Sequence, residues 1–406
     1  MAVNLQAPST LLPIAGARLG VAEAAIKRPG RKDMLLIELV QGTQVAGVFT
    51  RNAFCAAPVQ ICREVLATGV PVRGLLINSG NANAGTGQEG LLRARRSLAA
   101  AAAALDCDAG QVLPFSTGVI GQALPDERMT AAMPRAQSGL VGDGWIAAGQ
   151  AIMTTDTVMK GASRQVQTAA GTVTVTGIAK GAGMICPDMA TLLAFIGTDA
   201  RLSAEATQRC LQAAVAQSFN CVTVDGDTST NDSVVLFSTG AVGGRELAQD
   251  DADFPLICDA VAAVCIELAQ AVIRDGEGAT RLITVEVSGA GSEAEARMVA
   301  YTLAHSPLFK TAAFAGDANW GRILAAVGRS GVPELDVGRI DIDIDDVALI
   351  RGGEPDPAYA EARGAAVFAK SEYTVSIRLG RGDAQTRIWT CDLSYDYVKI
   401  NAEYRT

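Results

Sequence analysis

The sequence contains very little histidine. Among its 406 residues there is one, His305. A metal site built from two or three histidines is therefore excluded, and a Ser/His/Asp triad could use only this residue. Proton transfer near neutral pH must come from His305 or from a group other than histidine.

Cysteine is present but is not arranged for cross-links or for metal. The 9 cysteines are an odd number, are spread along the chain and include no Cys-x-x-Cys pair. This usage is typical of reduced thiols in a cytosol-like compartment. It predicts neither a disulfide framework nor a zinc site, and we expect no metal.

The chain also lacks an excess of positive charge and a long apolar run. It carries 34 basic and 43 acidic residues, a formal net charge of −9, which is the wrong sign for a nucleic-acid partner. The longest apolar stretch, at residues 98–105, is too short to span a bilayer, and the N-terminus has no basic region of the kind that precedes a signal sequence. We expect a soluble, cytoplasmic protein with no nucleic-acid or membrane partner.

What the chain does have is a mixture of strand and helix patterns. Short β-branched or apolar runs predict strands at 34–40, 45–49, 73–78, 172–179, 192–197, 234–238, 281–289, 340–345 and 373–379. Longer stretches predict helices at 89–106, 203–219 and 254–278, the second with Ser203 as its N-cap. The motif IDIDID at 340–345 predicts isoleucines on a buried face and aspartates on a solvated face. The fold class is therefore mixed α/β.

Four glycine-bearing loops are candidates for chemistry, at 78–90, 116–121, 180–195 and 316–322. The first has G-x-G-x-x-G spacing, but no acidic residue follows where dinucleotide binding needs one, and the chain has no P-loop. The second, STGVIG, has small residues and successive backbone N–H groups that a tight turn could direct at an oxyanion. A plain turn is the alternative that these residues leave open.

The third loop runs through Pro187 and Ala190 into Thr191, which opens an apolar strand. A threonine hydroxyl needs an adjacent base to act as a nucleophile. A cut before Thr191 would supply that base, because an N-to-O acyl shift followed by ester hydrolysis leaves a free α-amine whose pKa is about 7.7–8.0. One residue would then carry both nucleophile and base. An Ala-Thr bond with only a structural role is the alternative on this pattern alone.

Six motifs, in order along nearly the whole chain, carry a resemblance to a known family. They are NSGNANAGTG (78–87), STGVIG (116–121), AIMTTDT (151–157), KGAGMICPDMATLLAF (180–195), GDANWGRIL (316–324) and NAEYRT (401–406). In this combination the chain resembles the ornithine acetyltransferases, also called glutamate N-acetyltransferases, of arginine biosynthesis. The resemblance implies an acetyltransferase that moves the acetyl group from N-acetylornithine to glutamate through an acetyl-threonine ester, giving ornithine and N-acetylglutamate.

The resemblance further implies that the precursor cuts itself between Ala190 and Thr191. The products would be an α-chain of residues 1–190 and a β-chain of residues 191–406, assembled as α2β2 or larger. The implied fold is a layered α/β sandwich. It is similar to the N-terminal-nucleophile hydrolases in its self-cleavage but different in its strand connections.

The same motifs imply the residues of the site. Thr191 is the nucleophile, and Thr117 and Gly118 match the family's oxyanion pair, donating through a side chain and a backbone N–H. The implied substrate contacts are Lys180 for an α-carboxylate, Glu277, which we assign to the ornithine ammonium on physical grounds, Thr154 or Thr155, Thr191, Asn401 and Thr406. A solvated loop lysine and a helix-end carboxylate are the structural alternatives for Lys180 and Glu277.

Several functional questions stay open at this level. No motif decides whether acetyl-CoA is a second donor, and no other cofactor is expected. The main alternative is a self-processed Thr-nucleophile amidase or aminopeptidase, in which water takes the acyl group, and a binding protein that never cuts itself is a third. His305 matches no family role, and we expect Asp317 and Asn319 to shape their loop rather than to react.

Overall fold

The computed structural model describes residues 2–186 and 192–403. The chain divides into two compact units. The first, called here the N-terminal unit, comprises Ala7–Asn220 and Asp227–Val272. The second, the C-terminal unit, comprises Met1–Gln6, Cys221–Gly226 and Ile273–Thr406. The predicted chain ends at 190 and 191 fall, in sequence, inside the N-terminal unit, so the units are not the two predicted chains, and the cut stays a prediction.

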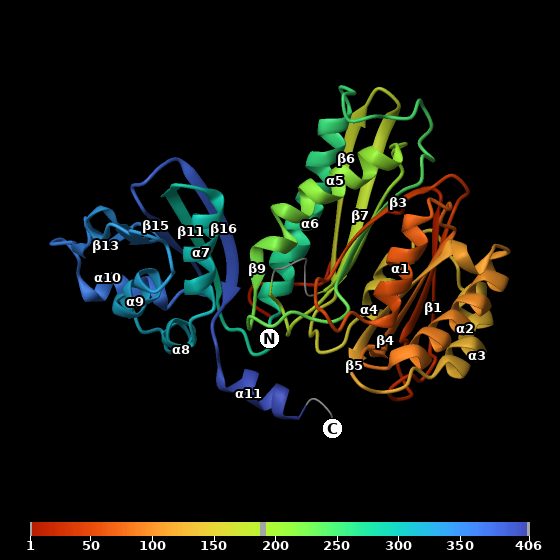
Figure 1. Cartoon of the computed structure of the whole chain (residues 1–406), viewed down its shortest axis with the longest axis horizontal. Coiled ribbons are helices and arrows are strands. Elements are labelled where there is room, and N and C mark those ends of the chain that lie inside the picture. The colour runs from red at the N-terminus through yellow and green to blue at the C-terminus, as the bar shows by residue number, and fades with distance from the viewer. Residues whose placement is uncertain (1, 187–191, 404–406) are drawn as a thin grey trace. The chain divides into compact units, whose positions relative to one another are not determined.

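The N-terminal unit is built from two sheets (Figure 1). The first is ordered β1 (Ala17–Ala22), β2 (Met34–Leu39), β4 (Gly74–Asn81) and β5 (Val112–Val119). The second is ordered β3 (Gln44–Phe49), β10 (Ser233–Ser238), β8 (Leu193–Thr198), β7 (Gly171–Lys180) and β6 (Lys160–Thr168). Both sheets mix parallel and antiparallel pairs, for example β4 with β5 and β10 with β8 in parallel.

Helices pack against these sheets. They are α1 (Ala57–Ala67), α2 (Gly87–Leu105), α3 (Asp126–Ser138), α4 (Trp145–Ala151), α5 (Ala204–Ala216) and most of α6 (Phe254–Arg274). Strand periodicity divides β2 between two cores: Leu35 and Ile37 pack with the second sheet, whereas Met34 and Leu36 pack with α2 and α3. Aromatic rings join the sheets, since Phe115 of β5 meets Phe195 of β8 edge to face at 5.0 Å.

Helix α6 corrects the sequence-based search for apolar runs, which took 98–105 as the longest. By length and composition α6 could cross a membrane, because its most apolar window has a mean hydropathy of 2.1. However, 61% of that window is buried. Val264 and Leu268 pack against Gly177 of β7, where a side chain would crowd them. This packing accounts for the composition, because core helices are as apolar as membrane spans.

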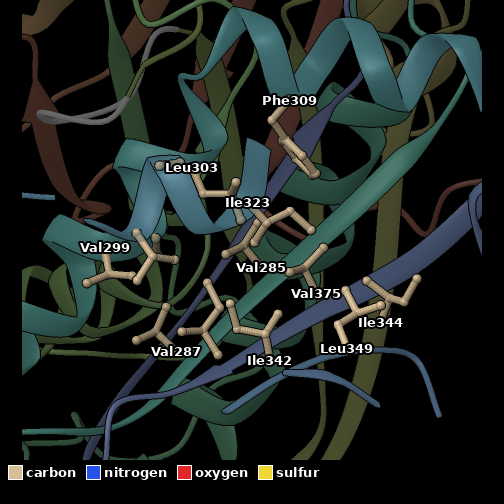
Figure 2. Close-up of a cluster of buried hydrophobic side chains, with 14 of the residues drawn as sticks. Val285, Val287, Val299, Leu303, Phe309, Ile323, Ile342, Ile344, Leu349 and Val375 are labelled. Carbon is tan, nitrogen blue, oxygen red and sulfur yellow. The ribbon is translucent and has the colours of Figure 1, made fainter. Parts of the chain in front are cut away.

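The C-terminal unit has one seven-stranded sheet, ordered β14 (Glu354–Pro355), β13 (Val347–Arg351), β12 (Asp341–Ile344), β15 (Glu372–Arg378), β11 (Leu282–Ala290), β16 (Ala384–Cys391) and β9 (Val222–Thr223). One face packs against α7 (Glu293–Ala304), α8 (Pro307–Ala315), α9 (Trp320–Gly328) and α10 (Glu361–Phe368). Figure 2 shows this core, in which Val285 and Val375 of the sheet meet Leu303, Phe309 and Ile323 of the helices. The last helix, α11 (Tyr395–Ala402), follows β16.

The sequence-based prediction for IDIDID is confirmed. Ile342 and Ile344 are buried, while the aspartates are ion-paired on the other face: Asp341 with Arg378, Asp343 with Arg351 and Asp345 with Lys370. The side chains of these ion pairs are partly exposed, so the aspartates lie on a solvated face, as the alternation of the motif predicts.

The α/β sandwich class is confirmed. All nine predicted strands and all three predicted helices are present with ends shifted by a few residues, and Ser203 caps α5 by accepting a hydrogen bond from Ala206 N at 3.1 Å. Strands β1, β5, β6, β9, β13, β14 and β16 and the other α-helices of the described residues were not predicted. None of the nine cysteines forms a disulfide, in line with the expectation of thiols.

Candidate active site

The predicted oxyanion pair lies in a strand, which corrects the expectation of a tight turn at 116–121. Thr117 and Gly118 belong to β5, and Gly118 is paired with Gly80 of β4 where the register of the two strands shifts. Gly118 has φ +134°, and a Cβ on it would overlap the Gly80 carbonyl carbon. Only glycine fits there, because an L side chain would be strained in φ and would collide with the neighbouring backbone.

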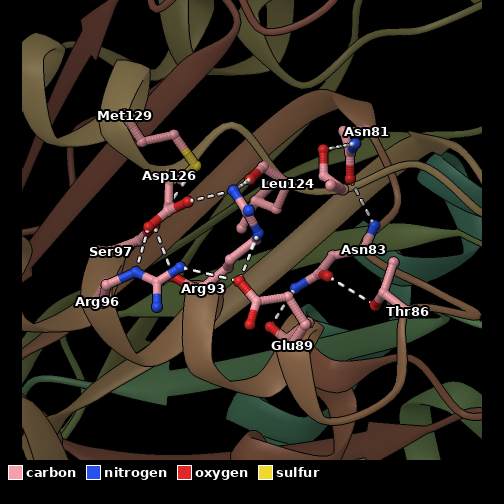
Figure 3. Close-up of polar contacts among 12 residues, drawn as sticks. Asn81, Asn83, Thr86, Glu89, Arg93, Arg96, Ser97, Leu124, Asp126 and Met129 are labelled. Atoms are coloured by element: carbon pink, nitrogen blue, oxygen red, sulfur yellow. Dashed lines mark hydrogen bonds and ion pairs between the residues drawn. The ribbon is translucent and has the colours of Figure 1, made fainter.

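Buried amides hold the two strands in this irregular register. The Asn78 side chain donates to Asn81 O at 2.8 Å and accepts from Ser116 Oγ at 2.6 Å. Figure 3 shows the continuation, in which Asn81 Oδ1 accepts from Asn83 N and Asn83 Oδ1 accepts from Thr86 Oγ1. The NSGNANAGTG motif is therefore a scaffold for the Gly80–Gly118 contact. The side-chain amides replace ladder hydrogen bonds that a bulge removes.

Asn231 was missed by the sequence analysis, and it joins β5 to the start of β8. Its Nδ2 donates to Ser116 O at 2.9 Å and to Ala82 O at 2.6 Å. Two residues later Ser233 opens β10, where it is paired with Leu193 and donates its N–H to Leu192 O. Strand β5, which carries the predicted oxyanion pair, is thus held beside the first described residues after the predicted cleavage point. Ala190 and Thr191 lie outside the described residues.

Lys180 is the last residue of β7 and is paired with Leu193 of β8, so it also lies at this end of the sheet. Lys180 is half-buried, and its positive charge lowers the pKa of the Asp156 carboxyl. This position does not match the alternative of a solvated loop lysine.

Asp156, in the AIMTTDT motif, was not singled out from the sequence. Burial alone would raise the pKa of its carboxyl, but the Lys160 and Lys180 cations and its hydrogen bonds hold that pKa well below its usual range. Asp156 Oδ2 accepts from Thr154 N at 2.9 Å, and both Thr154 and Thr155 are half-buried. The choice between these two threonines as substrate contacts stays open.

Glu277 and Asn401 are brought together from positions far apart in the sequence. Glu277 follows the end of α6, is 8% exposed, and its Oε2 accepts from Asn401 Nδ2 of α11 at 2.8 Å. Ser394, which precedes α11, donates from Oγ to Gly278 O at 2.7 Å and so fastens this helix beside the 275–278 turn. Among the residues that the structure describes, Asn401 is the one polar partner of the Glu277 carboxylate. Thr406 lies outside the described part.

The remaining candidates have structural surroundings. His305 Nε2 lies 3.0 Å from Thr223 Oγ1, and burial together with Lys310 and Arg329 lowers the pKa of its imidazole. Asn319 caps α9 by accepting from Arg322 N and donates to Asp317. That pair shapes its loop, as expected. Within the described residues, no group of three or more His, Cys, Asp and Glu side chains could hold a metal ion.

Each unit has features that are typical of enzymes acting on small charged molecules. The N-terminal unit has a glycine that brings two backbones close together and a half-buried lysine at the end of a strand. The C-terminal unit has a buried carboxylate with one neutral partner among the described residues. The model of the ArgJ family matches residues 18–406. The chain belongs to the ArgJ family.

Relatives match the chain from end to end. It is 53% identical over 407 residues to the arginine biosynthesis bifunctional protein ArgJ of Pseudomonas fluorescens (strain Pf0-1), with 100% of both chains covered. It is 56% identical over 396 residues to the protein of the same name from Methylococcus capsulatus, covering 98% of this chain and 97% of that one. A crystal structure of the arginine biosynthesis bifunctional protein ArgJ from Bacillus halodurans also matches. Its sequence is 41% identical, the TM-score is 0.49, and the match covers 51% of this chain and 97% of that one.

Proposed function

We propose that this chain is an acetyltransferase of arginine biosynthesis that moves the acetyl group from N-acetylornithine to glutamate. The products are ornithine and N-acetylglutamate. The observation that carries the proposal is the family match over residues 18–406, together with 53% identity across the whole of a bifunctional arginine-biosynthesis protein. The geometry of β5, Lys180 and Glu277 supports it.

The enzyme first makes its own nucleophile. Thr191 Oγ attacks the carbonyl carbon of Ala190, the peptide C–N bond breaks as the ester forms, and water hydrolyses the ester. The α-amine of Thr191 is then free, and its pKa of about 7.7–8.0 suits a base near neutral pH. The products are the chains 1–190 and 191–406.

Acetyl transfer then takes two steps. The Thr191 hydroxyl attacks the acetyl carbonyl of N-acetylornithine while its α-amine takes the proton, and the C–N bond breaks as the proton passes to the leaving amine of ornithine. The amine of glutamate next attacks the acetyl ester, and Thr191 leaves with its proton restored. Thr117 and the Gly118 N–H stabilise the oxyanion in both steps, a contribution of about 10²–10³ in rate for one donor.

Charged groups select the substrates. Lys180 binds the α-carboxylate that both substrates carry, and Glu277 binds the side-chain ammonium of ornithine. Asn401 acts through its hydrogen bond to Glu277, because the amide holds one carboxylate oxygen and leaves the other to the ammonium. Thr154 or Thr155 and the terminal Thr406 add further contacts.

The relatives are named bifunctional, which supports a second activity. We assign to it acetyl-CoA as an alternative donor at the same threonine, with no other cofactor. The two chains of one precursor assemble as α2β2, and the enzyme works in the cytoplasm.

Initial-rate kinetics test the transfer. With N-acetylornithine and glutamate both varied, a ping-pong enzyme gives parallel double-reciprocal lines. Thr191→Ala should remain one uncut chain without activity. Release of acetate at the same rate with and without glutamate would instead identify an amidase, and intersecting lines would exclude the acetyl-enzyme. Repeating the assay with acetyl-CoA in place of N-acetylornithine tests the second donor.

A further inference from the structure

The carboxylate of Asp156 joins two segments that each carry a proposed substrate contact. Oδ1 accepts from Lys160 Nζ at 2.6 Å and from Gly181 N at 2.7 Å, and Oδ2 accepts from Thr154 N at 2.9 Å. Thr154 itself is a candidate contact, and Gly181 directly follows Lys180. One side chain therefore fixes the backbone at both positions.

The pair of Asp156 and Lys160 is completely buried. Both side chains are 0% exposed, and Lys160 Nζ makes a second hydrogen bond, to Val158 O at 3.2 Å. Removing both charges from water costs several kcal/mol per ion, so such a pair is weak evidence of a contribution to stability. Its position relative to the proposed site suggests another role.

Two lysines of different exposure act on Asp156. The charges of Lys160 and Lys180 both lower the pKa of its carboxyl. Lys160 is buried with Asp156, whereas Lys180 is half-buried at the end of β7. An ammonium group in that position complements the α-carboxylate of an amino-acid substrate.

Gly181 is also tightly surrounded. With φ +156°, a Cβ on it would lie 3.1 Å from Ile185 Cδ1 and 3.3 Å from Leu192 Cβ. The backbone here has little room to shift while its N–H is bound by Asp156. Lys180 therefore begins from a fixed main-chain position, which is the condition for precise binding.

We propose that Asp156, kept charged and compensated by Lys160, is the positioning residue for Lys180 and for the backbone at Thr154 in recognising the substrate carboxylate. The inference rests on the proposed function, since the carboxylate belongs to N-acetylornithine and to glutamate. Asp156 acts through Lys180 and through the main chain.

The test removes both charges together, in the double variant Asp156→Asn/Lys160→Met, so that no buried charge is left alone. The matched control is Arg164→Met/Glu267→Gln, which removes an exposed ion pair that begins on the same strand, β6. For each protein, the KM for N-acetylornithine and for glutamate is measured. The amplitude of the acetyl-enzyme burst counts the competent sites.

We expect the double variant to raise both KM values by about 10–100-fold with an unchanged burst amplitude, because a displacement of about 1 Å can cost 10²-fold. The control should match the wild type. Unchanged KM values, or a smaller burst with unchanged KM values, would overturn the inference, since the second result is that of a structural pair. A wild-type enzyme that gives no burst would instead remove the proposed function.

A second variant tests the inference if the double variant does not fold. Asp156→Glu keeps both charges, but its longer side chain cannot reach the three donors in the same geometry. Both KM values should rise by about tenfold, given the same sensitivity to position. Wild-type KM values in this variant would also overturn the inference.

Discussion

Two nearly buried carboxylates, Asp156 in the N-terminal unit and Glu277 in the C-terminal unit, have opposite surroundings. Asp156 accepts three hydrogen bonds and faces two lysines. Glu277, in the described part of the chain, has one neutral amide as its partner. Counted over the whole residue, their exposures are almost equal, at 9% and 8%. What distinguishes the two carboxylates is the number of hydrogen-bond donors and cations around each.

The difference indicates what each carboxylate can do. A buried charge needs compensation, and Asp156 has all of it inside the protein. Its role is confined to holding other groups. Glu277 still has an oxygen to offer, so a cation from outside can complete its surroundings. We infer that a saturated carboxylate positions and an incompletely satisfied one binds.

The largest expected effect is on stability. Asp156→Asn leaves Lys160 buried beside a neutral group and should lower the free energy of unfolding by about 3–5 kcal/mol. Glu277→Gln removes a charge that forms no ion pair in the described part of the chain, and it should change the free energy of unfolding by less than about 1 kcal/mol. Urea unfolding at neutral pH measures both. Equal losses of unfolding free energy in the two variants would contradict the difference between the surroundings of Asp156 and Glu277.

The next effect is on substrate choice. Glu277→Gln should lower kcat/KM for N-acetylornithine by about 10–100-fold, the value of a charge-assisted hydrogen bond. The reaction of the acetyl-enzyme with glutamate should change by less than about threefold, because glutamate has no side-chain ammonium for that bond. Single-turnover acetylation and deacetylation separate the two. Loss of both to the same extent would contradict the assignment of Glu277 to the ammonium.

A smaller effect belongs to Asn401. Asn401→Ala removes the hydrogen bond that orients Glu277 but leaves the carboxylate, so acetylation by N-acetylornithine should slow by about 3–10-fold. Adding this change to Glu277→Gln should cost nothing further, since the two residues act as a unit. Additive losses in the double variant would mean that Asn401 acts separately from Glu277.

The smallest effect is a pH dependence. The pKa of Asp156 is lower in the folded protein than in the unfolded chain, where it is about 3.9, so its contribution to stability is complete above that value and is lost as the pH falls below it. The unfolding free energy of the wild type minus that of Asp156→Asn/Lys160→Met should therefore decrease between about pH 5 and pH 3. A difference that grows on acidification would contradict the lowered pKa. Urea titrations at several pH values measure it.

Much of the fold could be predicted because its strands are short apolar runs between turn residues. Strand β5 was missed: it contains Pro114 and then the small residues of STG, which read as a turn, and burial on both faces removes the alternation that marks a strand. Strands β6 and β16 are rich in polar residues, so their pattern resembles a loop. These three strands were identified only from their pairing with neighbouring strands, which the local sequence pattern does not show.

The site could be predicted only where motifs name residues. The resemblance singled out Glu277 and Asn401, and their roles as substrate contacts stay a prediction, but nothing local indicates that two residues so far apart in sequence share a hydrogen bond. Asn231 lies in a polar stretch that reads as a loop, and Asp156 carries no signal beyond its motif. Their roles come from hydrogen bonds between distant segments, which a single sequence does not encode locally.

The most direct test of the central claim is the intact mass of the purified protein under denaturing conditions, before and after brief exposure to N-acetylornithine. We predict two chains with the lengths of residues 1–190 and 191–406, the second gaining one acetyl group. A single chain of 406 residues that takes up no acetyl group would contradict Thr191 as the self-generated nucleophile.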